Sequence, residues 1–120
     1  MPVALPTPLV SAEHHAIGAA VATRITRQRL LGLGEPTHGE DTFSRIRNDL
    51  FAALVDHAGF TTIALETSAW HGRIVDAYVR GEGGDEDTVM ATGFTHGFGT
   101  SPANRELVRW IREHNSTRPA

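Results

Sequence analysis

The chain has no cysteine and no lysine among its 120 residues. Without cysteine it can form neither disulfides nor thiolate-based zinc sites, and it has no cysteine nucleophile. Without lysine it cannot supply the phosphate-binding lysine of a P-loop or the amine of a Schiff base, since all 11 basic residues are arginine. These absences exclude several common enzyme classes before any motif is considered.

An excess of positive charge is also missing. The formal net charge is −3 and the sequence pI is about 6.1, so the chain offers no basic face to a nucleic acid or an anionic membrane. No run approaches the ~20 apolar residues of a membrane span, and the apolar start at residues 1–10 is broken by Pro2, Pro6 and Pro8. We expect a cytoplasmic protein with an extended lead-in at 1–10, no nucleic-acid partner and no membrane partner.

The composition that remains, 40% hydrophobic and 21% charged, is typical of a globular domain. Helical periodicity predicts helices at residues 11–28, 39–57, 67–80, 86–91 and 104–114, the first of them capped by Ser11. Residues 30–34 and 61–66 are apolar or β-branched and predict two buried strands. The order strand, helix, strand, helix predicts an α/β fold, with parallel strands and covering helices.

Acidic side chains follow both predicted strands. Glu35 comes directly after the first strand and Glu66 ends the second, and the carboxyl ends of parallel strands meet at one edge of a sheet. Because neighbouring strands lie about 4.8 Å apart, the two carboxylates are predicted to converge. His38 opens the next helix beside them, and its imidazole is a candidate general base for water.

Arg47 and His96 complete the predicted constellation. Arg47 lies within the apolar stripe of helix 39–57, so its guanidinium is expected to face the sheet and to meet a carboxylate or a substrate oxygen. His96 lies in a loop between glycines, where Phe94 and Phe98 are expected to anchor the chain. It is an additional candidate for the site.

Each candidate also has a purely structural interpretation. Glu35 can be a turn residue near a helix N-terminus, His38 a capping or packing residue, and Arg47 a structural ion-pair partner. A phosphate-binding loop is disfavoured, because the third glycine of LLGLGEPTHG comes two residues too late for G-x-G-x-x-G and Glu35 would repel a pyrophosphate. The G-x-S-x-G elbow of serine hydrolases is absent.

Three collinear segments resemble the N-terminal part of the erythromycin esterase family. They are LGEPTHGEDTFSRIRNDLF, GFTTIALETSAWHGRIVDAYVRG and TGFTHGFGTSPANRELVRWIREHNSTRP, and they cover most of residues 30–119. The resemblance implies an α/β fold and hydrolysis of the macrolide lactone ring. It places the family's essential histidine on His38, its acidic partner on Glu35, its arginine on Arg47 and the end of its A-L-E strand on Glu66.

Members of that family are several times longer, so residues 1–120 are expected to form a single, incomplete domain at the N-terminal end of a larger α/β fold. The leading hypothesis is a bacterial hydrolase for a small-molecule ester or lactone, with a role in macrolide resistance. His38 activates the water, and no cofactor or metal is expected.

Two alternatives stay open. One is an inactive fragment or an assembly module of a split protein, which self-associates or binds a missing C-terminal half. The other is a metal-dependent hydrolase, in which Glu35, His38, Glu66 and His96 would bind zinc or manganese.

Overall fold

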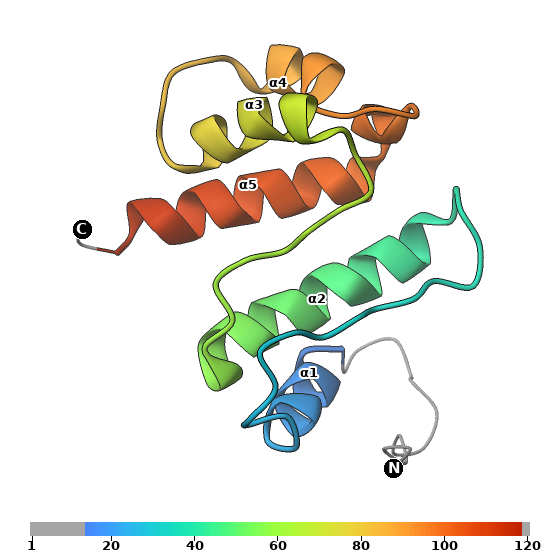
Figure 1. Cartoon of the computed structure of the whole chain (residues 1–120), viewed down its shortest axis with the longest axis vertical. Coiled ribbons are helices and arrows are strands. Elements are labelled where there is room, and N and C mark those ends of the chain that lie inside the picture. Colours follow the sequence, from blue (N-terminus) through green and yellow to red (C-terminus); the bar gives the residue numbers. More distant parts are fainter. Residues whose placement is uncertain (1–13, 119–120) are drawn as a thin grey trace. The chain divides into compact units, whose positions relative to one another are not determined.

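The computed structural model describes residues 14–118, and their regular structure is entirely helical. In chain order the helices are α1 (His14–Ala22), α2 (Asp41–Ala58), α3 (Ala69–Val79), α4 (Glu86–Thr92), the 3₁₀ helix η1 (Phe98–Thr100) and α5 (Pro102–Ser116). Figure 1 labels the α-helices. None of the described helices combines the length and the apolar character that a membrane crossing requires.

The chain gathers into two compact units. The first takes in the described residues up to Gly34 together with Ile46–Ile63, and the second takes in Glu35–Arg45 together with the described residues from Ala64 onward. The expectation of a single domain over residues 1–120 stays a prediction.

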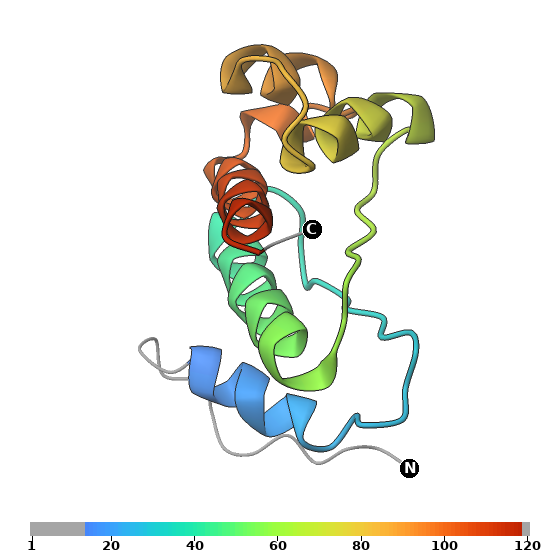
Figure 2. The ribbon, with the colours of Figure 1, turned by 90° about the vertical axis from the view of Figure 1, so that its left-hand side faces the viewer.

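The predicted α/β fold is wrong for this structure. Residues 30–34 and 61–66 form no strands, and residues 14–118 contain no β-sheet. Both segments run as irregular chain between helices (Figure 2). A parallel pair of strands is stable when other elements cover both of its faces, whereas Leu30 is 87% exposed and Leu33 is 44% exposed. The apolar pattern that predicted buried strands therefore belongs to segments that have no pairing strand among the described residues.

The first unit is built from α1 and the part of α2 from Ile46 onward. Its core contains Ala22, Ile25 and Leu54, with partly buried apolar side chains packed against them: Val21, Leu31, Leu50, Ala58 and Phe60. The two helices approach closely at Gly18, where an added Cβ would lie 2.5 Å from the Cβ of Ala53. Glycine at this position therefore sets the spacing between α1 and α2.

The first helix is shorter than the predicted span of 11–28. It ends at Ala22, because the amides of Arg24 and Ile25 bond to carbonyls three residues back and close a tighter turn. The predicted cap at Ser11 lies outside the described residues.

The second unit packs α3, α4, η1 and α5 around one apolar core (Figure 1). Its buried side chains are Tyr78, Val79, Val89, Met90, Phe94 and Val108, and the partly buried ones against them include Leu65, Val75, Phe98 and Ile111. Phe94 and Phe98 thus anchor the loop between α4 and α5, as predicted. The backbone of Gly99 lies directly against α4, since an added Cβ would lie 1.9 Å from the carbonyl oxygen of Met90.

Side-chain caps fix the starts of α4 and α5. The Asp85 carboxylate accepts the backbone N–H of Thr88 at 2.9 Å, and hydrogen bonding from the side chain and then the backbone of Thr88 lowers the pKa of Asp85. The Ser101 hydroxyl accepts the backbone N–H of Asn104 at 3.3 Å, and Pro102 follows in the first turn, where its missing N–H has no cost. Helix α5 therefore begins two residues before its predicted start.

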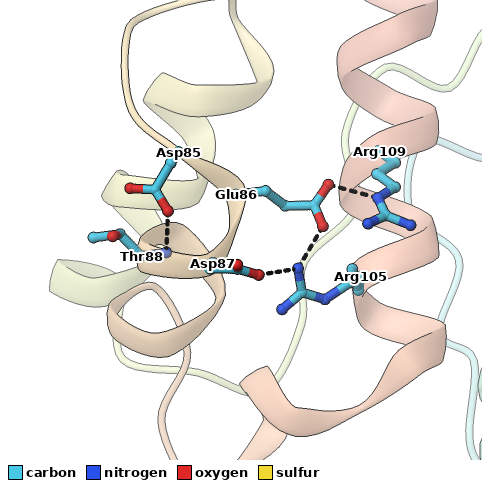
Figure 3. A network of polar contacts seen from close by, with 6 residues as sticks. All are labelled: Asp85, Glu86, Asp87, Thr88, Arg105 and Arg109. Atoms are coloured by element: carbon cyan, nitrogen blue, oxygen red, sulfur yellow. Dashed lines mark hydrogen bonds and ion pairs between the residues drawn. The ribbon is translucent and has the colours of Figure 1, made fainter.

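Carboxylates at the start of α4 pair with arginines of α5 (Figure 3). Glu86 accepts from Arg105 at 2.5 Å and from Arg109 at 2.6 Å, and Asp87 accepts from Arg105 at 2.7 Å. The hydrogen bond from Arg109 is the main cause that lowers the pKa of Glu86, against the opposing effect of desolvation. This network fastens α4 to α5.

Two further side chains of α5 satisfy the end of α3. The last carbonyls of a helix have no partner within it, and Arg112 donates to the carbonyl of Tyr78 while Asn115 donates to that of Val79 at 2.8 Å. The Arg112 guanidinium also lies 4.0 Å from the centroid of the Tyr78 ring, within range of a cation–π interaction. The second unit is thus bound by polar contacts at both ends of α5.

Candidate active site

The segment before α2 holds Glu35 and His38 together. Oε1 of the Glu35 carboxylate contacts Nδ1 of the His38 ring. Gly39 follows with φ at +82°, a left-handed conformation that glycine adopts without steric cost as the chain enters α2. The side chains of His38 and Glu35 are 67% and 37% exposed, respectively, so the imidazole is accessible to water and to a ligand.

Two contacts anchor the chain just after His38 within the second unit. The Ser101 hydroxyl donates to Oδ1 of Asp41 at 2.8 Å. Arg45 pairs with both carboxylate oxygens of Glu106, at 3.0 Å from Nη2 and 3.1 Å from Nε, and the hydrogen bond with Glu106 raises the pKa of Arg45. Because Ser101 caps α5 and Glu106 lies in its first turns, these contacts fasten the start of α2 to α5.

His96 occupies a tight turn with an unusual backbone. The carbonyl of Thr95 accepts the N–H of Phe98 at 3.1 Å, and the two residues between them, His96 and Gly97, have φ of +58° and +76°. Two successive left-handed residues define a type I′ turn. A left-handed conformation costs a non-glycine residue about 1–2 kcal/mol, and such strain is concentrated at functional sites.

A pair of threonines fastens the Glu66 segment to this turn. The N–H of Thr95 donates to the Thr67 hydroxyl at 2.8 Å, and the N–H of Ser68 donates to the Thr95 hydroxyl at 3.1 Å. Glu66 and His96 each adjoin one of these threonines, so their backbones lie near one another. The Glu66 side chain is exposed and forms no hydrogen bond or ion pair with other residues of the 14–118 range.

Phe98 links the two histidines of the site. The centroid of the Phe98 ring lies 6.0 Å from the centroid of the His38 ring, with an interplanar angle of 53°. It also lies 6.0 Å from the centroid of the His96 ring, with an angle of 45°. Both distances are within the range of tilted aromatic contacts. The second unit therefore brings His38 and His96 to the ring of Phe98, with Glu35 against His38. It carries Glu66 on the segment bonded to the His96 turn.

Arg47 belongs to the first unit, within α2. Its guanidinium is half-buried and donates to the side-chain oxygen of Asn48 at 2.9 and 3.2 Å. The expectation that it faces a sheet is wrong, because the described chain has no sheet. Its predicted role toward a carboxylate or a substrate oxygen stays a prediction.

The proposed metal ligands do not form a ligand set. Among residues 14–118, no three histidine, aspartate or glutamate side chains are placed to hold one metal ion. The alternative that used Glu35, His38, Glu66 and His96 as zinc or manganese ligands therefore has no support from this geometry.

The contact between Glu35 and His38 does have a chemical consequence. A carboxylate that accepts the Nδ1–H of an imidazole stabilises the tautomer whose Nε2 lone pair is free. Such a nitrogen can take a proton from water. The pair can therefore serve as a general base without a serine or cysteine nucleophile.

Sequence reasoning missed the residues that position this pair. The contact of Phe98 with both histidines, the Thr67–Thr95 hydrogen bonds and the Ser101–Asp41 hydrogen bond all join segments far apart in the chain. A local signal was present in Ser101-Pro102, which marks a helix start. This signal could have located the end of η1, but it could not have predicted the contact between Phe98 and His38.

Comparison with known proteins supports the predicted resemblance. The sequence profile of the family described as erythromycin esterase matches residues 55–120, just over half of the chain. These residues include Glu66 and His96, whereas Glu35 and His38 precede them. No solved structure matches the chain significantly.

A curated relative matches a longer part of the chain. Erythromycin esterase type II of Escherichia coli is 29% identical over 87 residues, which are 72% of this chain and 20% of the relative. The chain thus spans about a fifth of the length of that relative. From the family profile and this relative together, we conclude that the chain belongs to the erythromycin esterase family.

Proposed function

We propose that the chain carries a site for the hydrolysis of an ester or a lactone, in which His38 activates the attacking water. The observation that carries the proposal is the contact between Oε1 of Glu35 and Nδ1 of His38 on an exposed turn. Membership of a family named for an esterase supports the reaction class. The substrate we propose is a macrolide lactone or a simpler ester, by analogy with the name of the Escherichia coli relative, and a macrolide lactone would give the protein a role in resistance.

In the proposed reaction, Nε2 of His38 takes a proton from water while the water oxygen bonds to the carbonyl carbon. The bond from that carbon to the leaving oxygen then breaks, and the leaving alkoxide receives the proton. One water is consumed, and a carboxylic acid and an alcohol are formed. Glu35 keeps the imidazole in the reactive tautomer. Glu66, carried by the same unit, is the second carboxylate that we propose for the site.

The test is ester hydrolysis by the purified 120-residue chain, measured on p-nitrophenyl acetate and on a macrolide lactone. His38→Ala is expected to lower kcat by about 100-fold or more, the usual contribution of a positioned general base. His71→Ala is the matched control, because His71 is an exposed histidine of α3 in the same unit. Full activity in His38→Ala would reject the proposal.

A second candidate function is assembly, and the exposed apolar side chains favour it. Leu30 is 87% exposed and Trp70 is 78% exposed, and each has an exposed apolar neighbour, Leu33 and Ile74. Trp70 and Ile74 lie four residues apart on α3 and so share a face, and covering such a face removes apolar surface from water. We propose that they lie in contacts with a second copy of the chain. Light scattering over a range of concentrations should then show dimers, fewer with Leu30→Gln or Trp70→Gln, whereas a monomer at every concentration would oppose this candidate.

A further inference from the structure

We propose that Phe98 is a positioning residue that holds the imidazoles of His38 and His96 at one site, so that His96 is the second histidine of the hydrolytic centre. The inference rests on the proposed function for its chemical meaning. Its geometry is independent of that function and can be tested without any substrate.

His38 needs a second support beyond Glu35. Its side chain is 67% exposed, and the χ2 torsion that sets the plane of the imidazole has only broad preferences of its own. The tilted contact with Phe98, at 6.0 Å between centroids, restricts the ring plane. Glu35 thus selects the tautomer while Phe98 selects the orientation of Nε2.

Phe98 is itself firmly held. Its carbonyl accepts the side-chain amide of Asn104 at 3.0 Å, and Asn104 is only 6% exposed. Its N–H donates to the carbonyl of Thr95 at 3.1 Å, and the next residue, Gly99, lies against Met90 with no space for a side chain. A shift of Phe98 would break buried hydrogen bonds and core packing, which cost more than an exposed contact.

His96 has a strained backbone but adds little packing that would offset the strain. Its side chain is exposed, and its hydrogen bond joins Nδ1 to the hydroxyl of the adjacent Thr95 at 3.0 Å. Its other contact is with the Phe98 ring, on which His38 also rests. The turn is therefore better explained by the imidazole that it presents than by a gain in stability.

The arrangement gives the site two proton-exchanging groups on one aromatic support. Imidazole exchanges protons near neutral pH more readily than other side chains. Both imidazoles therefore take their places from the same Phe98 ring. The hydrogen bonds of Thr95 with Thr67 and Ser68 also hold the His96 turn in place.

The experiment is solution NMR of the histidine and phenylalanine rings in the isotope-labelled full chain. In the wild-type protein, nuclear Overhauser effects are expected from the Phe98 ring to the rings of both His38 and His96. Phe98→Leu removes the ring current, so the ring signals of both histidines should move toward their positions in the urea-unfolded chain. Phe98→Tyr keeps the aromatic ring and should leave both near their wild-type positions, and the signals of His71 should be unchanged throughout.

The inference would be overturned if the Phe98 ring showed nuclear Overhauser effects to one histidine only or to neither. The wild-type spectrum alone decides this point, so the test holds even if Phe98→Leu fails to fold. Hydrolysis is measured separately on the same variants. Phe98→Leu should lower kcat more than it raises KM, and Phe98→Tyr should restore kcat. An active chain whose kcat is insensitive to Phe98→Leu would overturn the positioning role alone, whereas full activity of His38→Ala with the expected spectra would overturn the proposed function alone.

Discussion

Two residues of the loop between α4 and α5 are fixed by opposite demands on the backbone. His96 adopts a left-handed conformation that glycine would adopt at no cost. Gly99, three residues later, is required because the Met90 carbonyl leaves no space for a Cβ. The consequences of substitution at these two positions therefore have opposite signs.

Gly99→Ala is expected to lower the free energy of unfolding by about 1–3 kcal/mol, the usual cost of overpacking. The reason is the 1.9 Å approach of the added Cβ to the Met90 oxygen, which forces η1 away from α4. Urea unfolding followed by circular dichroism measures the change. Gly83→Ala is the control, because nothing lies within 4 Å of a Cβ there, and equal losses in the two variants would contradict this account.

His96→Gly is expected to raise the free energy of unfolding by about 1 kcal/mol, since it relieves a left-handed conformation, and to lower ester hydrolysis. The matched variant is His71→Gly, which should lower stability by about 0.5 kcal/mol, because His71 lies in α3 and glycine is a poorer helix former than histidine. Thermal or urea unfolding of both variants decides the point. A loss of stability in His96→Gly would show that the imidazole has a structural role.

At the scale of elements, the attachment of α4 to α5 depends on the ionised form of Glu86. The hydrogen bond from Arg109 lowers the pKa of Glu86 below its ordinary value of 4.5. A carboxylate with a lowered pKa in the folded state contributes stability that is fully present above pH 4.5. This contribution is lost as the pH falls from that value through the lowered pKa.

Glu86→Gln should therefore reduce the free energy of unfolding at pH 7, by about 1 kcal/mol for a charged group that is mostly shielded from water. The difference from wild type should shrink at pH 3, because this pH lies below the ordinary pKa of 4.5 and the stabilising contribution is already being lost there. Urea unfolding at both pH values measures it. Glu113→Gln on the exposed side of α5 should change little at either pH, and a difference for Glu86→Gln that does not depend on pH would contradict the electrostatic explanation.

Sequence periodicity predicted helices well and strands wrongly, for a physical reason. A helix closes its backbone hydrogen bonds within one segment, so the apolar spacing from Phe43 to Val55 was sufficient to predict α2. A strand must find its hydrogen bonds in another segment. The β-branched stretch at 61–66 lacks such a partner among the described residues and forms an irregular link instead.

At the scale of the whole molecule, Glu35 and His38 were expected to lie close together, and they do, but for a reason other than the predicted one. Glu35, His38 and Glu66 were expected to meet at the edge of a sheet that Arg47 faces, with His96 as an additional candidate. No sheet exists among the described residues, and all of these residues except Arg47 belong to one helical unit. Glu35 and His38 meet because they lie three residues apart on one turn. His96 is brought to the same site through Phe98, which contacts both histidines. Phe98 lies 60 positions after His38, and no local sequence pattern predicts a contact over that separation.

The central claim is that Glu35 acts in ester hydrolysis only through its contact with His38. The most direct measurement is a double-mutant cycle in kcat/KM with Glu35→Gln, His38→Ala and the combined variant. We expect a loss in each single variant and a combined variant no slower than His38→Ala, because a residue that orients a base has no effect once the base is gone. Losses that multiply independently, or full activity in His38→Ala, would contradict it.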